Sequence, residues 1–130
     1  MRRTAVLLVL LAGCGNHDVT VAPECTDNVA VMKAAVSRLR PIAHCFQHAA
    51  GSADVQTVGA NVIETTNQLA DEVRKAPHSH SAVALGYLVG VVRRNAKGVH
   101  YETSRRVEQE LIGVPIDTPE FRRGLATGLR

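Results

Sequence analysis

The central part of the chain reads AVALGYLVGVVRRN over residues 82–95, and this stretch decides the fold. Drawn as a helix, it is apolar on nearly every side, which is typical of a helix that other helices surround. Ser79 and Ser81 precede it as candidate caps, and Lys97-Gly98 follows its end. We therefore expect residues 82–95 to form the central, most buried helix of a helical domain.

Two glycines within this stretch, Gly86 and Gly90, are four positions apart. Such a pair lies on one face of a helix and lets a neighbouring helix approach closely. In an apolar segment of about 20 residues it would suggest association within a membrane. Here the apolar run is shorter and Arg93-Arg94 closes it. We therefore expect the glycine pair to serve packing inside the domain.

The sequence on both sides of this helix contains start and stop signals of further helices. Apolar spacing predicts helices over residues 27–49, 52–75 and 99–112, with Ser52 as a cap of the second. Thr118 followed by Pro119 predicts the start of a last helix. Alternating patterns and hairpin turns, the signals of strands, are nearly absent. The fold class is thus predicted as all-α, a small up-and-down bundle of four to five helices.

The helical spacing also predicts which side chains face the core. This set comprises Val62, Leu69, Leu88, Val92, Tyr101, Val107, Leu111, Phe121, Leu125 and Leu129.

The beginning of the chain has the plan of a secretory signal peptide. Met1-Arg2-Arg3 is a short basic segment, and residues 5–12 are an apolar run. That run is far shorter than the roughly 20 residues of a spanning helix, so it does not anchor the protein by itself.

The residues that follow, Leu11-Ala12-Gly13-Cys14, resemble the lipobox of bacterial lipoproteins. The resemblance is confined to residues 1–14. It implies cleavage before Cys14, a diacylglyceryl group on the Cys14 thiol and acylation of the new amino terminus by a fatty acid such as palmitate. Two or more acyl chains give stable membrane anchoring, whereas one gives marginal binding. Gly15 stands where an Asp would resemble an inner-membrane retention signal, which favours the outer membrane.

This interpretation divides the chain into a signal peptide, residues 1–13, a lipidated tether, residues 14–24, and a helical domain, residues 25–130. Removal of Arg2 and Arg3 leaves 13 basic against 12 acidic residues, a net charge of +1. An exported and nearly neutral domain is a poor candidate for binding nucleic acid.

Cys25 and Cys45 remain as an even number of thiols in an oxidising compartment, which favours a disulfide. An unbroken helix over 27–49 would hold them about 30 Å apart, whereas a disulfide needs Cα atoms within about 7 Å. Two alternatives follow. Either the chain reverses near Arg40-Pro41, or the two thiols do not pair within one chain.

The histidines are the remaining candidates for chemistry. His44 and His48 are four positions apart on a predicted helix, a spacing that lets two imidazoles share a metal, but the pair should face solvent. His78 and His80 lie in the junction between the second and third predicted helices. The up-and-down order places this pair and the pair of His44 and His48 at opposite ends of the bundle. His17 and His100 have no evident partners.

We therefore expect a non-enzymatic helical protein of the bacterial cell envelope, anchored by lipid on Cys14, without a cofactor, that binds an envelope protein partner or has a structural role. The alternative is a periplasmic metal-binding or metal-sensing protein that uses His44, His48, His78 and His80. The sequence contains no nucleotide-binding loop, nucleophile elbow or zinc-protease motif.

Overall fold

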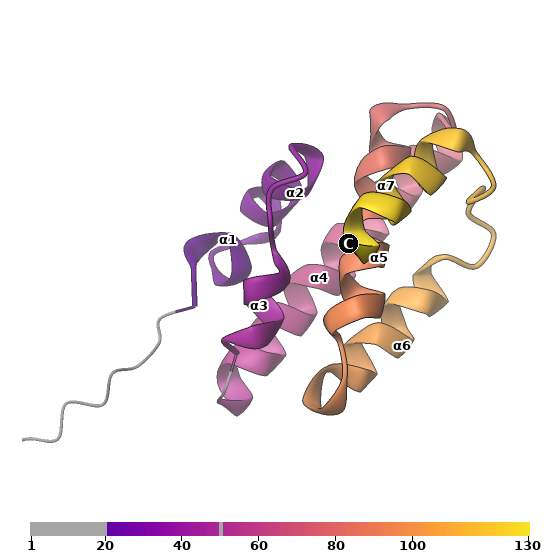
Figure 1. The fold of residues 1–130 in the computed structure, drawn as a ribbon. Helices are drawn as coiled ribbons and strands as arrows, with labels where there is room; N and C mark the ends of the chain where they lie inside the picture. The colour runs from indigo at the N-terminus through magenta and orange to yellow at the C-terminus, as the bar shows by residue number, and fades with distance from the viewer. Residues whose placement is uncertain (1–20, 50) are drawn as a thin grey trace, which may run out of the picture.

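A computed structural model of the chain describes residues 21–49 and 51–130. These residues are all-α, as predicted, and contain no strand (Figure 1). The helices are α1 (Pro23–Thr26), α2 (Val29–Ser37), α3 (Ala43–Gln47), α4 (Ser52–Lys75), α5 (His80–Asn95), α6 (Tyr101–Glu110) and α7 (Pro119–Leu129), with a 3-10 turn, η1 (Gly98–His100), before α6.

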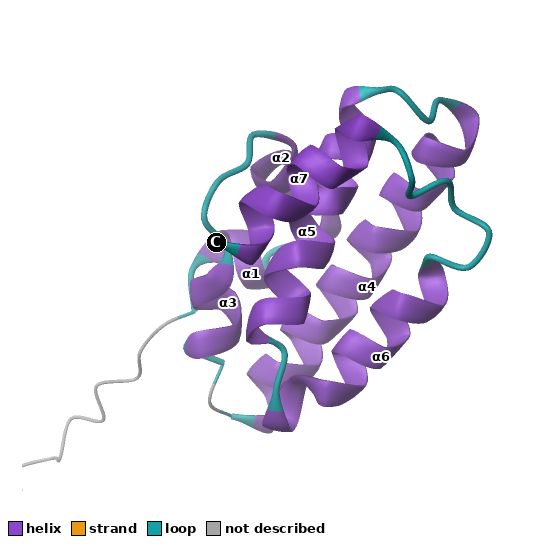
Figure 2. Cartoon of the chain, turned by 45° about the vertical axis from the view of Figure 1, so that its right-hand side comes forward, coloured by secondary structure: helices purple, strands orange, loops and turns teal. Residues whose placement is uncertain are grey.

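Helices α4, α5, α6 and α7 lie side by side and alternate in direction, with the three short helices at one side (Figure 2). The guanidinium of Arg74, near the end of α4, donates to the carbonyl oxygens of Glu110 and Ile112 after α6. The ends of α4 and α6 therefore meet at one pole of the bundle, and α5 returns between them. This is the predicted up-and-down order.

Helix α5 is the central element, as its apolar composition predicted. Every residue from Ala82 to Val92 is buried. Val62, Leu69, Leu88 and Val92 are all at most 1% exposed, which confirms the predicted core. Val107, Leu111 and Phe121 are also buried, whereas Leu129 is 46% exposed and was wrongly expected to face inward.

Helices α5 and α7 approach closely enough for their backbones to touch. A methyl group on Gly90 would lie 2.6 Å from the carbonyl oxygen of Leu125, and one on Gly124 would overlap the carbonyl oxygen of Val83. Gly86 meets Phe121 in the same way, and Gly128 meets Tyr87. The predicted packing role of Gly86 and Gly90 is confirmed, and α7 supplies a second pair that sequence reasoning missed. The pairing order shows that α5 and α7 run parallel.

The predicted helix over residues 27–49 is wrong, because the chain folds there as three short helices. Asn28 caps α2 by accepting a hydrogen bond from Val31 N at 3.0 Å. Helix α2 ends at Ser37, and Leu39 then adopts a left-handed conformation with φ of 52°. The apolar stripe continues across this break because α2 and α3 both pack against α4 and α5, so both face the core.

This reversal brings Cys25 and Cys45 together. They form a disulfide whose Cα atoms are 5.3 Å apart, and both residues are fully buried. Of the two alternatives left open by the sequence, the chain reversal is therefore the one that the structure contains. Helix α1 begins at Pro23, inside the segment expected as tether.

The residues at the starts of α7 and α4 bear on two other predicted helix boundaries. Thr118 accepts a hydrogen bond from Phe121 N at 3.2 Å and caps α7 as predicted, with Pro119 in the first turn. Ser52, in contrast, is the first residue of α4 rather than its cap. Gly51 holds the cap position and has no side chain to donate or accept.

Candidate functional site

An open groove of about 510 Å³ runs between α4 and α6. Its floor exists because α6 approaches α4 at a glycine. A methyl group on Gly59 would lie 2.7 Å from Oγ1 of Thr103, so a larger residue there would push the helices apart. The groove is lined by Val55, Gln56, Gly59, Ala60, Ile63, Glu64, Val99, Glu102, Thr103 and Arg106.

Two large apolar side chains stand exposed at the beginning of α6. Val99, which lines the groove, is 72% exposed, and Tyr101 is 67% exposed. Tyr101 was predicted to face inward, and that prediction is wrong. The η1 turn rotates the start of α6 so that His100, Thr103 and Val107 face the core instead. The groove therefore opens beside apolar surface that the fold leaves uncovered.

The rim of the groove carries charge. Glu64 projects from α4, and Glu102 and Arg106 project from α6. Arg105 donates two hydrogen bonds to Glu102, at 2.7 and 3.0 Å. These bonds are the main reason that the pKa of Glu102 lies below its ordinary value, so this carboxylate stays ionised. The arrangement can accept an apolar group along the floor and a basic group at the rim.

His100 is a buried polar residue that sequence reasoning did not place. It is 4% exposed, its Nε2 donates to the carbonyl oxygen of Phe46 at 2.9 Å, and its ring packs edge-on against the Phe46 ring with centroids 5.3 Å apart. Its Nδ1 has no partner among the described residues. His100 thus joins η1 to α3. The only signal in the sequence was its position three residues before Thr103 on the inward face of α6.

The four histidines proposed as metal ligands do not gather in the described part of the chain. His44 Nε2 lies 3.0 Å from Glu24, His78 Nδ1 lies 3.1 Å from Glu120, and His80 Nε2 bonds to the carbonyl oxygen of Ser37 at 2.5 Å. His48 is exposed.

One cluster of potential ligands does occur among residues 21–49 and 51–130. It consists of Cys25, His44 and Cys45, whose ligand atoms lie within 4.8 Å of one another. Both sulfurs are engaged in the disulfide, and His44 Nε2 lies 3.0 Å from Glu24, so these three residues do not act together as a set of metal ligands.

The features that predict the membrane anchor, Leu11-Ala12-Gly13-Cys14, lie outside the described residues, as does His17. Within the described ranges, none of the helices combines the length and the apolar character needed to cross a bilayer. Comparison of the chain with protein-family models, with curated proteins and with solved structures gave no match.

Proposed function

We propose that this protein is a lipid-anchored, non-enzymatic module of the bacterial cell envelope that binds an amphipathic helix of a partner protein in the groove between α4 and α6. The observation that carries the proposal is the groove itself, with an apolar floor over Val55, Ala60 and Ile63 and with Val99 exposed at its mouth. A helix laid in a groove between two helices is a common mode of recognition, with apolar side chains as anchors.

The charges at the rim favour one kind of occupant. Glu102 is engaged by Arg105, so Glu64 is the carboxylate of the lining without a cationic partner among the described residues, and Arg106 is the one cation of the lining. A partner helix with an apolar face and with Lys or Arg on the side that faces α4 would match both the floor and Glu64. Opposite charges across an interface act mainly on specificity and association rate.

The envelope location rests on the lipobox-like segment that ends at Cys14. Metabolic labelling with a fatty-acid analogue tests it directly. The wild type should take up the label, and the Cys14→Ser variant should not. Label that persists in the variant would contradict the anchor.

The groove is tested with two synthetic amphipathic helical peptides that share one apolar face and differ only in flanking Lys or flanking Glu. Fluorescence anisotropy should show the Lys-flanked peptide binding a few-fold more tightly, the effect of at most about 1 kcal/mol from an exposed ion pair with Glu64. Ala60→Glu places a charge on the groove floor and should abolish binding. Ala53→Glu makes the same change at an exposed position of α4 outside the lining and should leave binding intact.

Three results would contradict this part of the proposal. Equal binding of both peptides would remove the role of the rim charges, and binding that survives Ala60→Glu would place the peptide elsewhere. A dimer detected by sedimentation, dissolved by Ala60→Glu and not by Ala53→Glu, would show that a second copy of this chain occupies the groove.

A further inference from the structure

The outward face of α7 is basic. Arg122, Arg123 and Arg130 are exposed on it, together with Leu129. The helix contains one carboxylate, that of Glu120, which lies at its edge and is engaged by His78 at 3.1 Å. The buried side of the same helix holds Phe121 and the two glycines that meet α5, so the arginines point away from the core.

The basic surface continues from α7 onto its neighbours. A hollow of about 310 Å³ separates the end of α7 from the end of α5 and the loop before α3. Arg94 and Arg130 line it, its other lining residues are apolar or neutral, and none is acidic. Tyr87 also lines this hollow, and its hydroxyl donates a hydrogen bond to the carbonyl oxygen of Arg40 at 2.6 Å, which ties α5 to the loop before α3. We name these four arginines, Arg94, Arg122, Arg123 and Arg130, the basic face.

The basic face keeps most of its positive charge within the described part of the chain, with the charge of Arg123 acting on Glu120 one turn earlier. Some of the other cations do have carboxylate partners, as Lys33 has Glu72, Arg74 has Asp71, Arg93 has Glu108 and Arg105 has Glu102. No such ion pair involves an arginine of the basic face within residues 21–49 and 51–130. The guanidinium of Arg122 instead donates to the backbone carbonyl oxygen of Asp117 at 2.6 Å.

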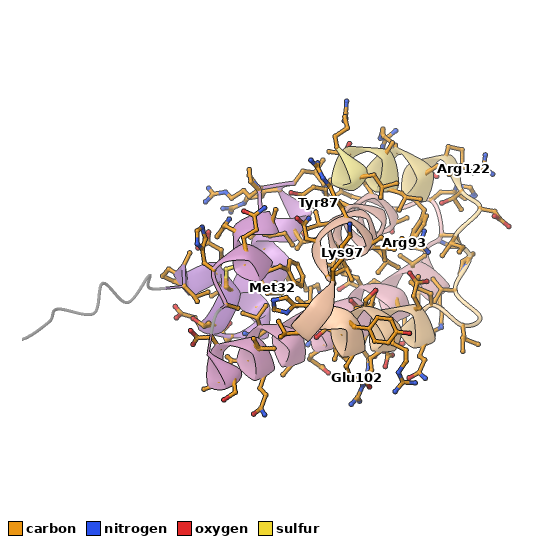
Figure 3. All side chains as sticks on the ribbon, turned by 60° about the horizontal axis from the view of Figure 1, so that its bottom comes forward. Met32, Tyr87, Arg93, Lys97, Glu102 and Arg122 are labelled. Atoms are coloured by element: carbon orange, nitrogen blue, oxygen red, sulfur yellow. A yellow bond between two sulfur atoms is a disulfide. The ribbon has the colours of Figure 1, made fainter. Side chains whose placement is uncertain are left out.

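The basic face and the groove lie on opposite sides of the molecule. In Figure 3, Arg122 on α7 lies at the upper edge and Glu102 on α6 at the lower edge, with Tyr87 and Arg93 between them. Binding of a ligand or membrane at the basic face therefore leaves the groove accessible.

We propose that the basic face binds the anionic phospholipid headgroups of the membrane to which the lipid anchor holds the protein. This proposal rests on the anchor proposed above. The guanidinium group matches the geometry of a phosphate, and an exposed apolar side chain such as Leu129 can enter the interface between headgroups and acyl chains.

The length of the tether and the range of the membrane's surface potential also favour anionic headgroups as the ligand of the basic face. Six residues, 15–20, connect Cys14 to Val21, and the seven steps between these two Cα atoms span at most about 25 Å. The anchor thus holds the domain close to the surface potential of anionic lipid, which decays within about 8–10 Å at physiological ionic strength. With the basic face on the membrane, the groove points away from it and toward a partner.

The absence of tryptophan from the sequence allows a direct experiment. Leu129→Trp places a single reporter beside the basic face, and Val99→Trp places one at the groove. The purified full-length product is bound to phosphatidylcholine vesicles that contain brominated lipid, with or without phosphatidylglycerol. We expect several-fold stronger quenching of the Leu129→Trp variant than of the Val99→Trp variant, and mainly in the anionic vesicles.

Two arginine pairs supply a matched control. In the Leu129→Trp background, Arg122→Glu with Arg123→Glu should abolish the quenching. Arg105→Glu with Arg106→Glu makes the same change of net charge on α6 and should leave the quenching in place. Equal loss in both would overturn the proposal, because net charge alone would then explain binding. A basic face that serves an acidic protein instead would leave the Leu129→Trp variant unquenched, which also overturns the proposal.

Flotation of the wild type separates this proposal from the anchor. Protein that floats with neutral vesicles and shows no quenching at position 129 contradicts the basic face and leaves the anchor standing. Protein that floats only with anionic vesicles, with quenching at position 129, contradicts the anchor and supports the basic face. Protein that floats with neither contradicts both.

Discussion

The N-terminal hairpin, residues 21–49, and the α5–α7 pair are held together by different means. The hairpin contains helices of four, nine and five residues, all shorter than the 12–15 residues at which isolated helices become even marginally stable. Its ends are joined by the disulfide between Cys25 and Cys45. Helices α5 and α7 have no covalent link and are joined by backbone contact over four glycines.

The comparison shows two solutions to the same problem of ordering helices in a small domain. A crosslink restricts the unfolded chain and stabilises a region whose own helices are weak. Close packing maximises contact in the folded state and needs residues with no side chain at the contact. Removal of the disulfide should therefore destabilise mainly the hairpin, and addition of a methyl group at a glycine should destabilise mainly the α5–α7 pair.

Loss of the disulfide should have the largest effect. Replacing Cys25 and Cys45 together by Ser should lower the free energy of unfolding by about 3 kcal/mol, the value for a loop of this length. Urea denaturation measures the total loss of unfolding free energy, and hydrogen exchange shows which helices lose stability. Amides of α2 and α3 should lose protection well before those of α5. Uniform loss of protection across both regions would contradict the comparison.

Steric change at the α5–α7 contact should come next. Gly124→Ala places a methyl group against the carbonyl oxygen of Val83 and 2.8 Å from Tyr87 N, so the helices must separate. We expect a loss of about 2–3 kcal/mol in thermal or urea unfolding, at the upper end for overpacked cores. Gly51→Ala is the control, because nothing lies within 4 Å of the added methyl group, and it should cost less than about 1 kcal/mol. Equal costs would mean that the close contact is not important for stability.

His100 joins the hairpin to η1, the turn that follows α5, since it bonds to Phe46 of the hairpin. His100→Phe keeps an aromatic ring against Phe46 but leaves the carbonyl oxygen of Phe46 without its donor. The expected loss is about 1–2 kcal/mol, because a buried acceptor without a partner is costly. Tyr87→Phe removes the half-buried bond to Arg40 and should cost about 1 kcal/mol or less. A larger loss from Tyr87→Phe would place the stronger connection at α2–α3 rather than at η1.

The smallest effect should be electrostatic. Burial alone would raise the pKa of Glu72, but hydrogen bonds from Lys33 and Ser81 and the charge of Lys33 together hold it below the ordinary value of 4.5. The stabilisation is therefore present above pH 4.5 and is lost as the pH falls through the lowered pKa. The pair is partly exposed, so solvent screening limits its contribution to less than about 1 kcal/mol.

The pH dependence of the thermal midpoint measures this effect. The midpoint should fall between about pH 5 and pH 3, and Lys33→Met should make that fall shallower. A fall of the same size in the variant would show that other carboxylates cause it.

The sequence predicted features that depend on local chemistry. The apolar run of α5 predicted its burial, and Thr118-Pro119 predicted the start of α7. It failed where tertiary contacts decide. No glycine marks the left-handed turn at Leu39, and the apolar spacing runs through it, so the break between α2 and α3 left no local signal. For the same reason, the pairing of Cys25 with Cys45 could only be left open.

The candidate groove was harder to predict than the helices around it. It depends on the approach of Gly59 to Thr103 and on the η1 turn that exposes Tyr101 and buries His100. Hydrophobicity alone favoured the opposite assignment, because tyrosine is more apolar than histidine. Both features arise from the packing of α4 against α6, which the spacing within either helix does not report.

The four glycines of the α5–α7 contact also constrain how this protein can diverge. Gly86 and Gly124 are 38 positions apart in the chain, and so are Gly90 and Gly128. Surface residues can change in a descendant that keeps the fold, but a side chain at any of these positions would force the two helices apart. Two glycine pairs of four-residue spacing, separated by about the length of α6 and its flanking links, therefore form a pattern by which distant relatives can be recognised after other similarity has been lost.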